Sequence, residues 1–421
     1  MSSRTPVRLL TLAVGVTSTA ALVVALTTAP PAEPGPVAVA SGPARSVIFI
    51  NGDGMGEAHR AAGRLHLVGP EGQLQMDQLP HSGSLTTDPD DPGSAITDSA
   101  AGASAWATGQ KTYNGAVSVD VEGNPLPTIG QQAKAAGKAT GLVTSAQVTD
   151  ATPAAFFAST TDRALQDEIA RQYLEVSRPD VVLGGGEDWW FPEGRPGAYP
   201  GGSGEEGSRS EQGDLVAMAQ ESGYTYVSTA EQLAAASGPK LLGLFANQEQ
   251  FEHEPEGKGD AYSPVVDLAT MTRKALDTLD AAPNGFFLLV EEEGVDEFAH
   301  ANNGEKMLLA MRHLDAAVAV ARAYVAENPD TLLVVTGDHE TGGLTVEDGN
   351  DSDDESGDGT SAEDGPFASA GTGLPFVLDW TTGGHTGGAV PVTADGPGAE
   401  RFSGQHPNTH VHEVLSTALG L

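Results

Sequence analysis

Short, continuous runs of apolar residues recur along the chain and are separated by stretches with helical spacing. The apolar runs lie at 46–50, 141–143, 181–183, 241–245, 286–290 and 332–335. Runs this continuous are typical of strands covered on both faces. Helical stretches lie between them, at 162–176, 264–279 and 305–327. The alternation predicts an α/β fold, with a large, mostly parallel central sheet and helices on both faces.

A short helix that begins with a serine is predicted between Thr97 and Gly109. Thr97 or Asp98 can cap it, alanines extend it, and Gly109 ends it. Ser99 then lies in the first turn, where free backbone N–H groups and the helix dipole favour an anion. Such a serine can hold phosphate or act as a nucleophile, although this stretch alone fits a plain capping serine as well. No Gly-x-Ser-x-Gly motif surrounds Ser99, which argues against a hydrolase triad.

The amino terminus has the pattern of an export signal. Arg4 and Arg8 precede an apolar run from Leu9 to Leu26, and Ala38-Val39-Ala40 is a cleavage pattern. We therefore expect residues 1–40 to be a signal peptide, and residues 41–421 to form one secreted or cell-surface catalytic domain. The apolar run is also just long enough to serve as a membrane anchor if it is not cleaved.

Composition narrows the classes of partner. The 421 residues include no cysteine and carry a net charge of -37. Without cysteine there is no disulfide framework, so an exported fold must depend on its core and on bound metals. The acidic charge excludes nucleic acid as a specific electrostatic partner. The oligomeric state is open, with a homodimer as one option.

Two stretches interrupt the alternation of strands and helices. Residues 187–213 are rich in Gly, Pro, Ser and Glu and predict an excursion loop. Residues 346–366 form an acidic insert, in which nine of the eighteen residues from Glu347 to Asp364 are acidic and none is basic. We interpret the insert as a solvated loop. Calcium binding is an alternative, but the insert lacks the glycine of an EF-hand loop.

Carboxylates and histidines follow several of the predicted strands. They stand after the first strand, after two later strands, and on a glycine-rich loop near the carboxyl terminus, as Asp53, Glu291, Asp296, His300, Asp338, His339 and His385. Imidazole with carboxylate is the ligand mixture that zinc accepts, whereas all-oxygen sets suit magnesium. Each residue alone could be a cap or a surface group. Their recurrence at strand ends, around a candidate nucleophile, indicates a metal centre.

Taken together, these stretches resemble the alkaline phosphatase family, the metal-dependent enzymes that form a phosphoserine, in its secreted bacterial type. The matching segments are 51–56 (NGDGMG), 98–101 (DSAA), 150–154 (DATPA), 291–300, 336–341 (TGDHET) and 385–387 (HTG). The resemblance covers nearly all of the sequence after the amino-terminal segment. It implies hydrolysis of small phosphate monoesters to an alcohol and inorganic phosphate.

The resemblance also implies roles for individual residues. Ser99 matches the nucleophile that becomes phosphorylated, and Arg163 matches the arginine that binds phosphate, with Asp98 orienting it. An arginine offers two phosphate oxygens a planar pair of donors that lysine cannot reproduce.

Three metal ions are implied as cofactors, two zinc and one magnesium. One zinc would be held by Asp296, His300 and His385. The second, beside the serine, would be held by Asp53, Asp338 and His339. The magnesium set would comprise Asp150, Thr152 and Glu291, with Asp53 bridging to it. Two zinc ions can stabilise the attacking and leaving oxygens of an in-line displacement.

One residue departs from the family's pattern. Relatives commonly carry lysine, histidine or tryptophan just after the position of Asp296, whereas this chain has Glu297. With Asp150, this residue would add a second carboxylate near the magnesium set. We therefore expect an altered phosphate affinity, and the identity of the third metal is open.

Two other enzymes and one non-enzyme compete with this interpretation. A phosphodiesterase of the same superfamily is disfavoured by Arg163 together with the magnesium set, and a sulfatase by the absence of a Cys/Ser-x-Pro-x-Arg motif at Ser99. An exported, acidic calcium-binding surface protein would explain the acidic insert, but it gives no reason for the serine, the arginine and the metal sets.

Overall fold

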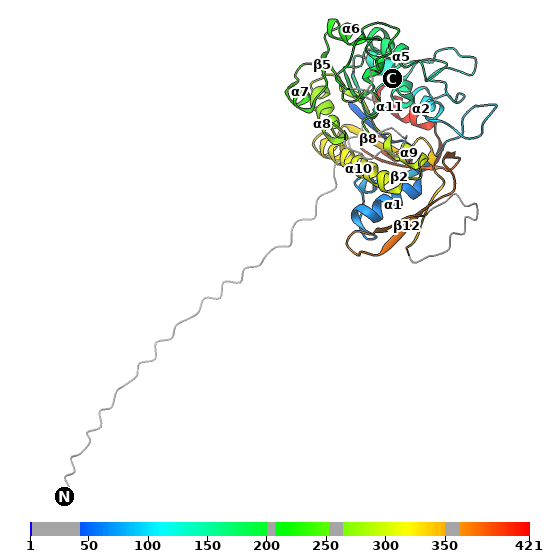
Figure 1. Cartoon of the computed structure of the whole chain (residues 1–421), viewed down its shortest axis with the longest axis vertical. Coiled ribbons are helices and arrows are strands. Elements are labelled where there is room, and N and C mark those ends of the chain that lie inside the picture. The colour runs from blue at the N-terminus through cyan, green and yellow to red at the C-terminus, as the bar shows by residue number, and fades with distance from the viewer. Residues whose placement is uncertain (2–42, 200–206, 252–263, 350–362) are drawn as a thin grey trace. The chain divides into compact units, whose positions relative to one another are not determined.

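The computed structural model describes Met1 and residues 43–199, 207–251, 264–349 and 363–421 (Figure 1). The predicted signal peptide therefore lies outside the described residues, as do the centre of the acidic insert and part of the excursion loop. No helix in the described part of the chain is long and apolar enough to cross a membrane.

A ten-stranded sheet forms the centre of the fold. Its order is β15-β2-β14-β8-β1-β7-β3-β4-β6-β5. The strands are β1 (Ser46–Gly52), β2 (His81–Thr86), β3 (Ala139–Gln147), β4 (Val181–Gly185), β5 (Thr225–Val227), β6 (Leu241–Leu244), β7 (Phe286–Glu292), β8 (Thr331–Thr336), β14 (Val390–Asp395) and β15 (Gly404–Pro407). Only β14 is antiparallel to its neighbours β8 and β2. The predicted mostly parallel sheet is confirmed.

The six predicted strands are neighbours in the middle of this sheet, as β8-β1-β7-β3-β4-β6. Every residue of β1, β4, β6, β7 and β8 is buried, as expected for strands covered on both faces. Successive side chains of β1 enter opposite layers, with Val47 and Phe49 on one side and Ile48 and Ile50 on the other.

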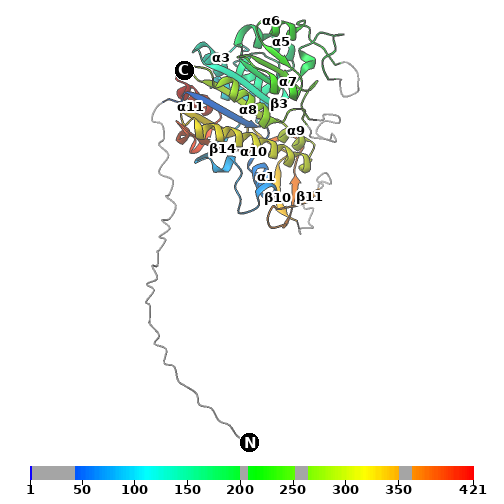
Figure 2. The same cartoon turned by 90° about the vertical axis from the view of Figure 1, so that its left-hand side faces the viewer.

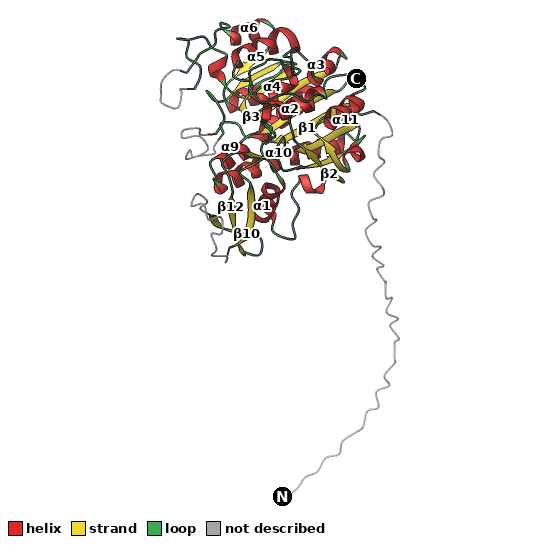
Figure 3. Cartoon of the chain, turned by 90° about the vertical axis from the view of Figure 1, so that its right-hand side faces the viewer, coloured by secondary structure: helices red, strands yellow, loops and turns green. Residues whose placement is uncertain are grey.

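Helices cover both faces of the sheet. One layer contains α2 (Ser99–Thr108), α3 (Ile129–Ala135), α4 (Ala151–Phe157), α5 (Gln166–Gln172), α6 (Leu215–Glu221) and α11 (His410–Leu419). The other contains α1 (Glu57–Val68), α7 (Ala230–Ala235), α8 (Leu268–Leu279), α9 (Gly294–His300) and α10 (Gly304–Glu327). Figure 2 shows α8 and α10 in front of the sheet, and Figure 3 shows α2 and α4 on the opposite side.

The predicted helices differ from the observed ones mainly at their starts. The expected helix 264–279 begins at Leu268, because Asp267 caps it by accepting the N–H of Thr270 at 2.8 Å. The expected helix 162–176 begins only at Gln166 and ends in a π-helical turn, Tyr173–Ser177.

Two small sheets lie apart from the central one. Strands β10 (Leu344–Asp348), β12 (Pro375–Trp380) and β11 (Asp364–Ala368) form an antiparallel sheet in the order β10-β12-β11. Both ends of the acidic insert are therefore strands. β9 (Glu340–Thr341) and β13 (His385–Thr386) pair with each other. The excursion loop opens with a 3-10 turn, Glu187–Trp189, and is otherwise irregular in its described residues.

Candidate active site

Most of the predicted site residues lie at the carboxyl ends of four neighbouring strands. β8, β1, β7 and β3 are adjacent and parallel, so their carboxyl ends meet at one edge of the sheet. The register places Asn51 of β1 between Thr336 of β8 and Glu291 of β7. The segments that follow these strands carry Asp53 and Asp338, which the sheet thereby brings together.

Ser99 is the first residue of α2, as predicted. Asp98 is the N-cap, and its Oδ1 accepts the backbone N–H of Ala101 at 2.9 Å. Gly109 ends the helix in the left-handed conformation, at a φ of 75°. Ser99 is only 5% exposed, and its Oγ lies 3.3 Å from Nε2 of His339. The serine hydroxyl therefore faces one of the predicted metal ligands.

The ligand set predicted for the zinc beside the serine is assembled and buried. Nε2 of His339 lies 3.4 Å from Oδ1 of Asp53 and 3.2 Å from Oδ2 of Asp338. Both of these carboxylate oxygens are buried without a hydrogen-bond partner. Burial, and then the charges of Asp338 and Asp296, raise the pKa of Asp53 well above its ordinary value. A dication would satisfy these oxygens and remove this repulsion, so the set fits zinc.

The set predicted for the other zinc is also assembled. Nε2 of His300 lies 3.2 Å from Oδ2 of Asp296 and 3.1 Å from Nε2 of His385, and Nε2 of His385 lies 3.6 Å from Oδ1 of Asp296. Backbone carbonyls orient both rings through their Nδ1 atoms, at 2.8 Å from Gly383 and 2.9 Å from Thr97. Each Nε2 is thus available as a ligand.

The two sets share a boundary. The ring of His339 stacks on that of His385 with centroids 3.6 Å apart, and donor atoms of Asp296, His339 and His385 also lie within metal-binding reach of one another. The hydroxyl of Thr341 donates to Oδ1 of Asp296 and lies 3.2 Å from Nδ1 of His339. Two metal ions bound here would be close neighbours.

The magnesium set is less compact. Glu291 accepts hydrogen bonds from Thr144 at 2.7 Å and from Asn51 at 3.4 Å, and burial raises its pKa to about 8. Oγ1 of Thr152 is buried without a hydrogen-bond partner. Among the described residues, the groups of at least three acidic or histidine donors within metal-binding reach are Asp53, Asp338 and His339, and Asp296, His339 and His385; neither contains Asp150 or Glu291. The magnesium set therefore stays a prediction.

Arg163 pairs with two carboxylates. Its Nη2 lies 3.2 and 3.0 Å from the two oxygens of Asp150, and its Nη1 lies 3.5 Å from Oδ2 of Asp98. Burial lowers the pKa of Arg163, but Asp150 and Asp98 outweigh burial and raise the pKa, so the guanidinium stays charged. The side chain is 32% exposed and can reach a ligand. Asp98 contacts the arginine as expected, although Asp150 makes the closer contact.

Several residues of the site were not expected from the sequence. Thr341 contacts ligands of both zinc sets, and Thr144 holds Glu291. Glu293, which follows β7, is 6% exposed, and its Oε2 is buried without a hydrogen-bond partner. Burial, and then the charges of Asp150 and Glu297, raise its pKa well above the ordinary value. Only the position of Thr341, two residues after His339 in a recognised motif, offered a signal.

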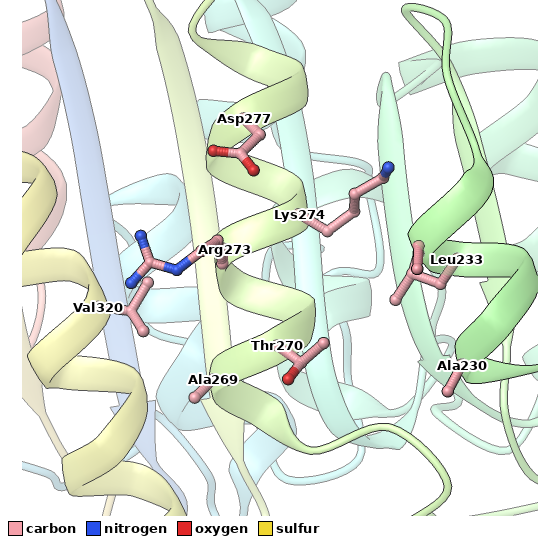
Figure 4. Close-up of a pocket in the computed structure, with 9 residues that line it drawn as sticks. Ala230, Leu233, Ala269, Thr270, Arg273, Lys274, Asp277 and Val320 are labelled. Carbon is pink, nitrogen blue, oxygen red and sulfur yellow. The ribbon is translucent and has the colours of Figure 1, made fainter.

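A groove of about 380 Å³ lies elsewhere on the molecule, between α7, α8 and α10. Figure 4 shows Arg273 and Asp277 of α8 with Leu233 of α7 and Val320 of α10. The residues that line this groove include none of the candidate active-site residues described above.

Comparison with known proteins defines the class. The family model for alkaline phosphatase matches residues 44–367. Streptomycin-6-phosphate phosphatase from Streptomyces griseus is 37% identical, over 94% of this chain and 95% of that protein. The cold-active alkaline phosphatase of a psychrophilic Shewanella species has a structure 32% identical in sequence, with a TM-score of 0.73 over 89% of this chain and 99% of that one.

The chain belongs to the alkaline phosphatase family and is a phosphatase. A variant of the alkaline phosphatase from the Antarctic bacterium TAB5, 26% identical with a TM-score of 0.71 over 90% of this chain and 99% of that one, has been solved with Mg bound in its M3 site.

Proposed function

We propose that the protein hydrolyses phosphate monoesters through a phosphoserine on Ser99, with two zinc ions and one magnesium ion as cofactors. The observation that carries the proposal is the contact of 3.3 Å between Ser99 Oγ and His339 Nε2. This contact supports the proposal, because the candidate nucleophile lies beside a buried set of candidate metal donors. A serine hydroxyl is a weak nucleophile by itself and requires such a neighbour.

The residues of this chain account for the steps of the reaction. Arg163 would bind two oxygens of the phosphoryl group and hold phosphorus in front of Ser99. Ser99 Oγ attacks phosphorus, the bond from phosphorus to the alcohol oxygen breaks, and the serine proton is transferred through solvent to the departing alcohol. Water then cleaves the Ser99 phosphate ester and releases inorganic phosphate. The start of α2 contributes N–H groups that favour the anionic phosphoserine.

Bound metal ions would supply chemistry that the side chains alone cannot. Asp53, Asp338 and His339 would hold one zinc, and Asp296, His300 and His385 would hold the other. Asp150, Thr152 and Glu291 would hold magnesium, with Asp53 bridging. The bound ions would neutralise phosphate charge, lower the pKa of the serine hydroxyl and stabilise the leaving oxygen.

Export is a further part of the proposal. Residues 1–40 would direct the chain out of the cytoplasm and be removed after Ala40. The mass of the protein recovered from the culture medium tests this. A chain that stays in the cytoplasm at full length would contradict it.

A panel of esters tests the reaction class. We expect rapid turnover of p-nitrophenyl phosphate, with bis-p-nitrophenyl phosphate and p-nitrophenyl sulfate slower by several orders of magnitude, because Arg163 and the metal sets suit a dianion with one ester bond. Phosphorylated aminoglycosides should be included, because the Streptomyces griseus relative is named for streptomycin 6-phosphate. Faster hydrolysis of the diester or the sulfate would overturn the proposal.

A further inference from the structure

We propose that Asn114 is a positioning residue that holds the nucleophile, the phosphate-binding arginine and a zinc ligand in register. The inference rests on the proposed function, since it assigns Asn114 to the same reaction. Asn114 is none of the predicted substrate-binding or metal-binding residues, and its side chain bonds to the backbone of Ile96 and Asp98. It acts through the three residues 96–98, directly before Ser99.

The segment 96–98 is connected to three parts of the active site. The carbonyl oxygen of Thr97 lies 2.9 Å from Nδ1 of His385 and so orients that zinc ligand. Asp98 caps α2, which begins with Ser99. Oδ2 of Asp98 lies 3.5 Å from Nη1 of Arg163. A displacement of this segment would therefore move the nucleophile, the arginine and the ligand together.

Asn114 fixes this segment with both ends of its side-chain amide. Its Oδ1 accepts the backbone N–H of Asp98 at 3.0 Å, and its Nδ2 donates to the carbonyl of Ile96 at 2.8 Å. The Ile96 carbonyl also accepts from the hydroxyl of Ser94 at 2.8 Å, so it keeps one partner if the amide is lost. The Asp98 N–H relies on Asn114.

The backbone around Asn114 completes the connection. The N–H of Gly115 donates to Oδ2 of Asp98 at 2.9 Å, and the carbonyl of Gly115 accepts the N–H of Arg163 at 2.9 Å. Asn114 is itself held, because its N–H donates to Oδ2 of Asp91 at 2.9 Å. Asn114 and Gly115 thus join Asp98 to Arg163 through side-chain and backbone hydrogen bonds. Supporting hydrogen bonds of this kind fix the geometry of catalytic residues.

Asn114→Ala removes both side-chain bonds and tests the proposal. Misplacement of a reacting group by about 1 Å costs roughly 100-fold in rate, so we expect a loss of kcat/KM of about 10- to 100-fold. We also expect inorganic phosphate to inhibit more weakly. Zinc should be lost more readily during dialysis against a weak chelator, because Thr97 orients His385. Zinc retention is read by elemental analysis and does not depend on turnover.

Asn124→Ala is the matched control. The amide of Asn124 donates to both oxygens of Asp120 at 3.1 and 3.0 Å, in an exposed turn of the same connection between α2 and α3, away from the site. This variant also loses amide hydrogen bonds, and we expect it to keep wild-type kcat/KM, phosphate inhibition and zinc retention. All variants are compared at a temperature at which circular dichroism shows them folded.

The outcomes separate the two proposals. Wild-type protein that does not hydrolyse monoesters refutes the proposed function. If the wild type is active, equal kinetics and zinc retention in Asn114→Ala and Asn124→Ala refute the positioning role alone. Should Asn114→Ala fail to fold, Asn114→Asp decides, because it keeps the acceptor for Asp98 but loses the donor to Ile96. A folded Asn114→Asp with a severalfold loss supports the role, and wild-type kinetics overturns it.

Discussion

At the scale of single residues, the site is a set of mostly buried metal donors, which hydrogen bonds from other segments of the same chain hold in place. His339 lies within 3.4 Å of Ser99, Asp53 and Asp338, and its ring stacks on His385. No single one of these residues would identify a site. Their chemistry becomes specific because the ends of the parallel strands, the start of α2 and the strand β13 place them within a few ångströms of each other.

Glu297, where we expect this chain to depart from the family's pattern, gives the first prediction. It follows Asp296 on α9, and its charge acts on His300. Two unit charges about 8 Å apart interact by roughly 0.5 kcal/mol even in water. Reversing a charge beside a phosphate dianion should therefore change binding by at least about 1 kcal/mol. We expect Glu297→Lys to tighten inhibition by inorganic phosphate severalfold.

Inhibition constants at matched zinc and magnesium concentrations measure this effect. Glu297→Gln is the control and should fall between the wild type and Glu297→Lys, because it removes one charge without adding another. If product release limits turnover, Glu297→Lys should also lower kcat at alkaline pH. The same inhibition constant in all three proteins would mean that Glu297 does not act on bound phosphate.

The sequence was sufficient to predict those site residues whose proposed role depends on their own side-chain chemistry. The helix start at Ser99 could be predicted from adjacent positions, with Thr97 or Asp98 as its cap, and the structure shows Asp98 in that role. The bonds of Asn114 could not, because they join it to a backbone N–H and a carbonyl 16 and 18 residues away. A backbone partner leaves no trace in residue type, so only the fold shows it.

At the scale of elements, a continuous apolar run decided which strands could be predicted: β14 is largely buried, but its sequence VPVTAD has no such run. The six expected strands are central, and β15, β2, β14 and β5 lie outside them. β2 has the sequence HSGSLT with a single buried residue, so it has no apolar run to detect. The ends of the acidic insert also lack a continuous apolar run, so β10 and β11, which pair with β12, were not predicted as strands.

One contact between elements leads to a prediction of pH dependence. Oδ1 of Asp315 in α10 accepts the backbone N–H groups of Gln75 at 2.7 Å and Met76 at 3.4 Å. Burial raises the pKa of Asp315 to about 6. The pKa of Asp315 is higher in the folded chain than in the unfolded chain, so its protonated form stabilises the fold. This stabilisation is complete below about pH 4 and is lost as the pH rises through about 6.

Asp315→Asn keeps an acceptor oxygen and removes the ionisation. We expect this variant to be more stable than the wild type at pH 7.5, by at most about 3 kcal/mol, and to lose about two thirds of that advantage at pH 4.5. Urea denaturation of both proteins at the two pH values measures the free energies of unfolding. If the free energies of unfolding of the variant and the wild type differ by the same amount at both pH values, Asp315 has an ordinary pKa.

At the scale of the whole molecule, charge and metal binding are coupled. The chain carries a net charge of -37, and the zinc sets concentrate carboxylates in its interior. Charge of one sign destabilises a compact state through self-repulsion. The family's fold is maintained here without any cysteine, so bound dications are the expected source of additional stability.

Removal of metal should therefore lower stability and activity together. A ligand at 1,000 times its Kd stabilises a fold by about 4 kcal/mol, so a chelator should lower Tm by several degrees or more. Zinc should restore turnover, and magnesium should increase it further. Thermal scans and assays on the same samples, with elemental analysis as the control, measure both effects. Full activity or an unchanged Tm in protein free of metal would contradict the coupling.

The proposed function depends most on the covalent step at Ser99. Wild-type protein is mixed with a monoester, quenched in acid, digested and mapped by mass spectrometry, beside Ser99→Ala treated in the same way. We predict a single phosphorylated residue, Ser99, in the wild type and none in the variant. The variant should still bind zinc in elemental analysis, because Ser99 is not one of its predicted ligands. A phosphate label on any other residue, or undiminished turnover by Ser99→Ala, would contradict the account.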